Sequence, residues 1–183
     1  MKNKKLEQYA QMLLQWNQIH ALSGAKNQDE VLKNIKSSLY PLEIKELNLA
    51  KKSLLLDIGS GNGFPAVPLG IMLGIPTILC EPNAKKAAFL QNLKAYLNLE
   101  NFIIKKQKVE SLRLEKAPDL ITSRATFSTE ILLNKCKHLI TKDSMLLLFK
   151  GQNVKNEIPA NLAYSCYETS SFNYLVILGE NIC

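Results

Sequence analysis

The sequence predicts an α/β fold in which helices cover both faces of a mostly parallel, seven-stranded sheet. Short apolar runs alternate with helical patterns from residue 51 onward, which is typical of parallel strands joined by crossover helices. Three glycines directly follow the first apolar run, at positions 59, 61 and 63. The last two apolar runs have no clear helix between them, so we expect a hairpin at one sheet edge with at least one antiparallel strand.

The first 50 residues are predicted to form a helical extension in front of the sheet. Four residues recur at helical spacing and predict an amphipathic helix over 4–19: Leu6, Tyr9, Leu13 and Trp16. Asn27 followed by Glu30 resembles a capped helix start, and Pro41 closes that second helix. We expect one domain over 1–183, made of this extension (1–50) and a Rossmann-like core (51–183).

The core is predicted as alternating strands and helices. Strands are expected at 53–58, 77–81, 102–105, 119–123, 144–150, 162–168 and 174–179. Helices are expected at 68–74, 84–97 and 128–139. Pro65 and Pro68 both follow the glycines, and a proline beyond the first turn removes a helical hydrogen bond. We therefore place the start of the first core helix near Pro68.

Composition and charge narrow the class of protein. The chain has 183 residues, of which 46% are hydrophobic and 21% charged, as in ordinary globular domains. It contains no apolar run near the roughly 20 residues that span a bilayer. The N-terminal residues lack the pattern of a signal peptide, so we expect a cytoplasmic protein with no membrane contact. A formal charge of +7 suggests an anionic partner, although a solvated lysine-rich surface would give the same charge. A monomer is expected.

The chain offers no obvious metal site. Its four cysteines have no C-x-x-C spacing and are expected to be buried or idle thiols: Cys80, Cys136, Cys166 and Cys183. We therefore predict no bound metal.

The glycine-rich stretch predicts a nucleotide-type cofactor site. Residues 54–68 read LLLDIGSGNGFPAVP, where a strand runs into a loop and a helix. Dinucleotide folds usually show G-x-G-x-x-G, whereas here Phe64 replaces the third glycine after Gly59 and Gly61. Phe64 and Pro65 would crowd a pyrophosphate at the helix start. The pattern therefore favours S-adenosylmethionine, which has no phosphate, over NAD.

Two acids at strand ends are candidate cofactor residues. Glu81 ends the second strand, where a carboxylate can accept hydrogen bonds from ribose hydroxyls. Its alternative is a surface acid that pairs with Lys85 or Lys86. Asp57 is expected to order the glycine loop or to form hydrogen bonds near the methionyl amine, and not to do chemistry.

Further candidates follow the later strands. Val109 and Glu110 lie where an adenine would lie, and Glu110 is either an acceptor for the adenine amine or a helix-capping or solvated acid. Arg124 ends the fourth strand and can offer fixed donors to a cofactor carboxylate or a substrate phosphate, with an ion pair at a helix start as the alternative. Lys150 ends the fifth strand, where it either meets RNA phosphate or is simply exposed.

Five segments, in order, carry a recognisable pattern: DIGSGNGFPAVPLGI, CEPNAKKAAFLQNL, KVESL, DLITSRA and LFKG. Together they resemble the bacterial small-subunit rRNA methyltransferase G family, also called glucose-inhibited division protein B. The resemblance implies a Rossmann-like class I S-adenosylmethionine-dependent methyltransferase that methylates N7 of a guanine in 16S rRNA. It assigns cofactor contacts to Gly59, Phe64, Val109, Glu110 and Arg124.

The chain departs from the family pattern in the second predicted helix. The family usually shows H-x-x-D-S-L there, whereas this chain has Asn34, Ser37, Ser38 and Leu39. A role for that histidine or aspartate therefore does not carry over.

The implied chemistry needs few reactive groups. Guanine N7 has a free lone pair and no proton, so no general base is required and we assign no catalytic residue. His20 and His138 lie outside the motifs and are expected to be structural. Catalysis would consist of positioning, and nearby acids would offset the positive charge that moves onto the guanine.

The expected partner is 16S rRNA or a small-subunit assembly intermediate. Two alternatives stay open: a methyltransferase with another RNA, protein or small-molecule acceptor, and a non-catalytic RNA-binding assembly factor. An NAD oxidoreductase is disfavoured by Phe64.

Overall fold

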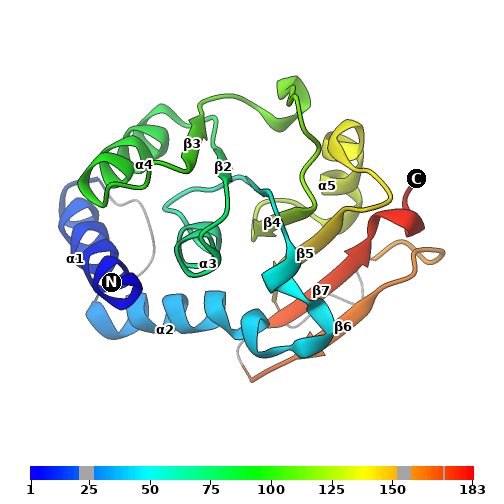
Figure 1. Cartoon of the computed structure of the whole chain (residues 1–183), viewed down its shortest axis with the longest axis horizontal. Coiled ribbons are helices and arrows are strands. Elements are labelled where there is room, and N and C mark those ends of the chain that lie inside the picture. Colours follow the sequence, from blue (N-terminus) through cyan, green and yellow to red (C-terminus); the bar gives the residue numbers. More distant parts are fainter. Residues whose placement is uncertain (21–26, 152–157, 171) are drawn as a thin grey trace.

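The computed structural model describes residues 1–20, 27–151, 158–170 and 172–183. One sheet organises the chain, with the strand order β3-β2-β1-β4-β5-β7-β6 (Figure 1). Its strands are β1 Leu55–Ile58, β2 Thr77–Cys80, β3 Phe102–Lys105, β4 Leu120–Arg124, β5 Met145–Lys150, β6 Ser165–Glu168 and β7 Asn173–Leu178. The strand order reverses between β1 and β4, which are parallel neighbours. Ligands of open α/β sheets bind at such a reversal.

The helices cover the two faces of this sheet unequally. They are α1 Lys2–His20, α2 Gln28–Leu39, α3 Ala66–Leu73, α4 Ala84–Tyr96 and α5 Thr129–Cys136. Side chains of α1 to α4 share one hydrophobic cluster with one face of the sheet. Side chains of α5 and of the segment before β4 share the second cluster with the other face. A largely parallel sheet covered on both faces is confirmed.

The N-terminal extension packs directly on the core. Tyr9 and Leu13 of α1 and Val31 of α2 are 0% exposed and belong to the same hydrophobic cluster as β1. The predicted start of the second helix is confirmed, since Asn27 Oδ1 accepts a hydrogen bond from Glu30 N–H at 2.9 Å. This packing brings α2 beside the sheet edge that carries the glycine loop, as the contacts between α2 and α3 show.

The start of α3 differs from the prediction. The helix begins at Ala66, two residues before the predicted Pro68, and Pro65 is its N-cap. Pro68 is therefore the third helical residue. The first N–H groups of a helix have no intrahelical partner, so a proline at this position removes no hydrogen bond.

The end of the chain forms the predicted hairpin. Strand β7 pairs antiparallel with both β5 and β6, and β6 is the outer edge. Strand β7 is thus antiparallel to its two neighbours and is the second strand from the sheet edge. This arrangement places the connection between β6 and β7 next to the carboxyl end of β5, where Lys150 faces Asn173.

Within the described part of the chain, no helix has both the length and the apolar character needed to cross a bilayer.

Candidate functional site

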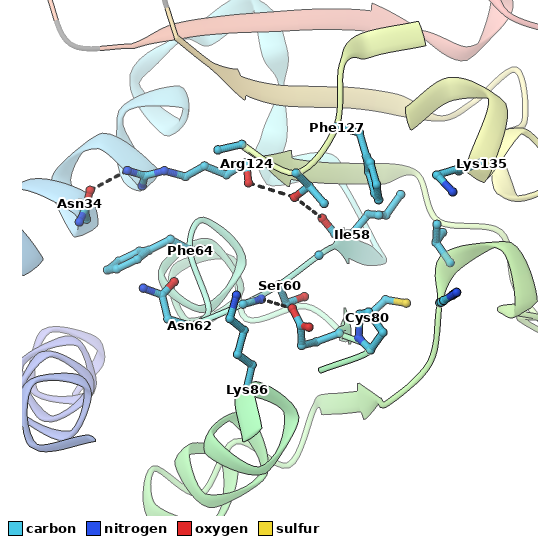
Figure 2. Close-up of a pocket in the computed structure, with 18 of the residues that line it drawn as sticks. Asn34, Ile58, Ser60, Asn62, Phe64, Cys80, Lys86, Arg124, Phe127 and Lys135 are labelled. Carbon is cyan, nitrogen blue, oxygen red and sulfur yellow. Dashed lines mark hydrogen bonds between the residues drawn. The ribbon is translucent and has the colours of Figure 1, made fainter. Parts of the chain in front are cut away.

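A cleft of about 1140 Å³ opens at the carboxyl ends of the parallel strands (Figure 2). Its walls come from the loops after β1, β2, β3 and β4, from α2, and from the β6–β7 connection. Seven of the predicted cofactor residues line it: Gly59, Gly61, Phe64, Glu81, Val109, Glu110 and Arg124. Asp57 is not part of the lining and lies beneath it, 1% exposed. The fold therefore brings these seven residues together at one cleft.

The glycine loop forms the floor of the cleft next to β1. Gly59 and Gly61 have φ values of +72° and +55°, a region that favours glycine. A Cβ on Gly59 would lie 2.5 Å from Thr126 Cγ2, so the β4–α5 turn packs against this glycine. Thr126 was not identified from the sequence, because only the tertiary fold brings it to the loop.

Glu81 joins the glycine loop to the end of β2. It is 5% exposed, and its Oε2 accepts a hydrogen bond from Gly61 N–H at 2.7 Å. Its Oε1 accepts another from Asn83 N–H at 2.8 Å. Both partners are backbone groups, so in the described chain this carboxylate is turned to the loop and not to Lys85 or Lys86. Each carboxylate oxygen keeps a lone pair that can accept from a ligand hydroxyl.

Asp57 is a buried acid under the same loop. Its Oδ1 accepts a hydrogen bond from Thr122 Oγ1 at 2.6 Å, while Oδ2 has no partner among the described residues. Burial raises the pKa of Asp57 to about 7, because the ionised form is poorly solvated there. The Ser60 hydroxyl donates to the Asp57 backbone carbonyl at 3.1 Å, which ties this strand end to the loop.

Arg124 is held in the cleft wall by a neutral residue. Its Nη2 donates to Asn34 Oδ1 at 2.6 Å, and its guanidinium carbon lies 4.5 Å from the centroid of the Phe172 ring and 5.6 Å from that of Phe64. Nη1 is buried without a hydrogen-bond partner in the described chain. Burial lowers the pKa of Arg124. A buried guanidinium held by an amide and two rings is suited to an anionic ligand group.

Asn34 and Phe172 were not predicted as site residues. The one signal in the sequence was that Asn34 stands where the resembled family usually has histidine. The side chain comes from α2, so the N-terminal extension contributes to the cleft (Figure 2).

The other end of the cleft carries an ion pair. Glu110 is paired with Lys135, and this hydrogen bond holds the pKa of the Glu110 carboxyl below its usual value. The Lys135 ammonium also lies 5.3 Å from the centroid of the Phe127 ring. Val109 is buried beside this pair, with 4% of its surface exposed. The roles of Lys135 and Phe127 were missed because the contacts join separate segments.

Both predictions for Lys150, a contact with RNA phosphate and simple exposure, differ from what the structure shows. Lys150 is only 8% exposed, and its Nζ donates to the Phe127 carbonyl oxygen at 2.8 Å. It is therefore neither a surface lysine nor a residue of the cleft lining, and it anchors the β4–α5 turn from below.

The remaining reactive side chains are not arranged for covalent catalysis. Cys80 lines the cleft, but burial raises the pKa of its thiol to about 12, so it is protonated at neutral pH. His138 lies outside the cleft and forms a hydrogen bond with the Leu112 carbonyl at 3.0 Å. The side chain of His20 lies outside the described residues. Among the residues that the structure describes, the cleft thus offers binding groups and no activated nucleophile.

The chain is similar to known proteins along nearly its whole length. The sequence profile of the family described as rRNA small subunit methyltransferase G matches residues 2–177. The ribosomal RNA small subunit methyltransferase G of Helicobacter pylori is 41% identical over 172 residues, covering 93% of this chain and 90% of its own. That of Wolinella succinogenes is 40% identical over 177 residues, covering 96% and 89%.

Solved structures of proteins with much lower sequence identity also resemble this chain. A solved structure of a putative S-adenosyl-L-methionine-dependent methyltransferase from Methanococcus maripaludis superposes with a TM-score of 0.62 at 17% identity. It covers 85% of this chain and 91% of that one. At this identity the comparison shows that the fold is shared.

Proposed function

The chain belongs to the rRNA small subunit methyltransferase G family, and from this we propose that it transfers the methyl group of S-adenosylmethionine to N7 of a guanine in 16S rRNA. One observation in the structure carries the proposal. The Glu81 carboxylate at the end of β2 is hydrogen-bonded to Gly61 of the loop after β1, at the reversal of the strand order. Open α/β sheets bind nucleotide-type cofactors at such a reversal, which supports the proposal.

The lining residues fit such a cofactor. Glu81 would accept hydrogen bonds from the ribose hydroxyls, and Glu110 would accept from the adenine amine. Gly59 and Gly61 let the methionyl part approach the backbone closely. Arg124 provides the cation for the methionyl carboxylate. Asp57, beneath the loop, would hold the loop in shape.

The chemistry needs little beyond positioning. S-adenosylmethionine supplies an electrophilic methyl group, and guanine N7 supplies a lone pair without first losing a proton. The absence of an activated thiolate in the described cleft agrees with this reaction, because Cys80 is protonated. The residues of the cleft hold the two reactants close and in line. The Glu81 carboxylate would also favour the positive charge that the guanine ring acquires.

The acceptor we propose is 16S rRNA or a small-subunit assembly intermediate, in the cytoplasm and with the protein acting as a monomer. Among the described residues, four lysines line the cleft and contribute positive charge to it: Lys33, Lys86, Lys108 and Lys135. Contacts between lysines and phosphates make RNA binding sensitive to salt, so we expect activity to fall steeply as the salt concentration rises. A guanine within folded rRNA must be unstacked or already exposed to enter the cleft.

The test uses small subunits from a strain that lacks the corresponding gene. They are incubated with the protein and S-adenosylmethionine labelled in the methyl group, and the rRNA is digested to nucleosides. We expect label in 7-methylguanosine from 16S rRNA and little in free GTP. Label in another nucleoside, or GTP methylated as fast as rRNA, would show that the acceptor is different. Binding of S-adenosylhomocysteine without any transfer would favour a non-catalytic assembly factor.

A further inference from the structure

Phe127 is the most exposed aromatic ring among the described residues that line the cleft. It is 36% exposed, whereas Phe64 is 6% exposed and Phe172 packs against the Arg124 guanidinium. We propose that Phe127 forms one wall of an adenine slot and stacks on the adenine of the methyl donor. The inference rests on the proposed function and adds a cofactor-binding residue that neither the glycine loop nor the family resemblance identifies.

The position of the ring ties it to the adenine end of the cleft. The Lys135 Nζ lies over the Phe127 ring, 5.3 Å from its centroid, and forms the ion pair with Glu110. A single lysine side chain therefore links the ring to the acid expected to accept from the adenine amine. Val109 and Pro82 line the same cleft and supply further apolar surface. An aromatic face beside an acceptor for an exocyclic amine is the chemistry that recognises adenine.

The acceptor guanine is assigned to the part of the cleft between its two ends, away from Phe127. In Figure 2, Phe127 and Lys135 lie together on one side of the cleft, and Asn34, Phe64 and Arg124 lie together on the other. The methionyl carboxylate is expected at Arg124, and the reactive methyl group lies between that carboxylate and the adenosine. An incoming base must therefore approach away from Phe127.

Contacts of the β4–α5 turn fix the backbone of Phe127. Buried Lys150 donates to the Phe127 carbonyl at 2.8 Å, and Ser128, the next residue, caps α5. Ala125 precedes them with a φ of +49°, so the turn is sharply constrained. A ring whose backbone is already fixed loses little conformational freedom on binding, which favours affinity. This gives buried Lys150 a role in the site that it does not line.

The experiment is a calorimetric titration of S-adenosylhomocysteine into the wild-type chain and three variants. Phe127→Ala removes the ring, Phe127→Trp keeps an aromatic face, and Ile131→Ala removes a 48% exposed side chain four residues further along, outside the cleft lining. We expect Phe127→Ala to raise Kd roughly 5- to 100-fold, the usual effect of losing one aromatic–base stack. Phe127→Trp and Ile131→Ala should bind nearly as the wild type does.

A spectroscopic readout separates stacking from a structural effect. In Phe127→Trp, S-adenosylhomocysteine should quench a fluorescence component that the wild type, with Trp16 alone, does not show. If Phe127→Ala bound S-adenosylhomocysteine with an unchanged Kd, the proposal would be overturned. A raised KM for small subunits in the same variant would show that the ring contacts the acceptor instead. Should Phe127→Ala not fold, an unquenched tryptophan at 127 would overturn it equally. Failure of the wild type to bind at all would count against the proposed function instead.

Discussion

Arg124 and Asn34 are 90 residues apart in the sequence, and Arg124 Nη2 donates to Asn34 Oδ1 at 2.6 Å. This hydrogen bond connects the carboxyl end of β4 to α2 of the N-terminal extension. The extension is thereby part of the binding site, because it fixes the guanidinium that we assign to the methionyl carboxylate. Two variants separate the binding group from the group that positions it.

Replacing Arg124 by alanine should weaken binding of S-adenosylhomocysteine more than replacing Asn34 by alanine. Hydrogen bonds to charged groups contribute about 1.5–3 kcal/mol, so Arg124→Ala should raise Kd by roughly 10- to 100-fold. Asn34→Ala leaves the cation and should have a smaller effect. Methylthioadenosine, which lacks the carboxylate, should bind all three proteins alike. Full turnover by a folded Arg124→Ala variant would contradict the assignment of Arg124 to the methionyl carboxylate.

Glu81 is expected to bind the cofactor by accepting hydrogen bonds from its ribose hydroxyls. Glu81→Ala removes the acceptor for both the ligand hydroxyls and Gly61 N–H, and Glu81→Gln keeps one acceptor oxygen. We predict a loss of affinity for S-adenosylhomocysteine of roughly 10-fold or more in the alanine variant and a smaller loss in the glutamine variant. Exposed Glu100, which does not line the cleft, provides the control Glu100→Gln. Equal affinity of Glu81→Ala and wild type would contradict the ribose assignment.

Gly59 and Gly74 allow a matched test of the glycine loop. Their φ values are nearly equal, +72° and +74°, so alanine is strained at either position. A Cβ on Gly59 would lie 2.5 Å from Thr126, whereas one on Gly74 meets no atom within 4 Å. Gly74→Ala should therefore lose only about 1 kcal/mol of stability and keep its affinity for the cofactor. Gly59→Ala should abolish binding of S-adenosylhomocysteine in calorimetry, and retained binding would disprove the close approach at this loop.

The buried Asp57 predicts a pH dependence of stability. The pKa of its carboxyl is 3.8 in the unfolded reference and about 7 in the fold. Between these values the unfolded chain is ionised while the folded chain retains the proton, so the Asp57 contribution to stability falls as the pH rises. The slope is at most about 1.4 kcal/mol per pH unit. Below pH 4 both states are protonated, and this dependence ends.

Asp57→Asn removes this titration and keeps an acceptor for Thr122. Urea denaturation at several pH values between 4 and 8 compares the two proteins. The free energy of unfolding of the wild type should fall relative to that of the variant as the pH rises. A difference that stays constant, or that changes in the opposite direction, would show that Asp57 is not a buried, protonated acid.

Local patterns in the sequence predicted much of the site, and contacts between distant segments account for what was missed. The glycine loop and Glu81 follow strands directly, so strand periodicity alone placed them at one sheet edge. Asn34 and Phe127 reach the cleft only through the packing of α2 and the turn after β4. Lys150 also ends a strand, but its Nζ donates to the backbone carbonyl of Phe127 and does not enter the cleft. Strand position fixes where a residue lies and not which way its side chain points.

The central claim is that the methyl donor binds at the carboxyl ends of β1 and β2. A crystal structure of the chain with S-adenosylhomocysteine tests it most directly. We predict electron density for the ligand in the cleft, with its ribose at Glu81 and its methionyl part over Gly59 and Gly61. Clear ligand density elsewhere on the protein, with this cleft filled only by water, would contradict the claim.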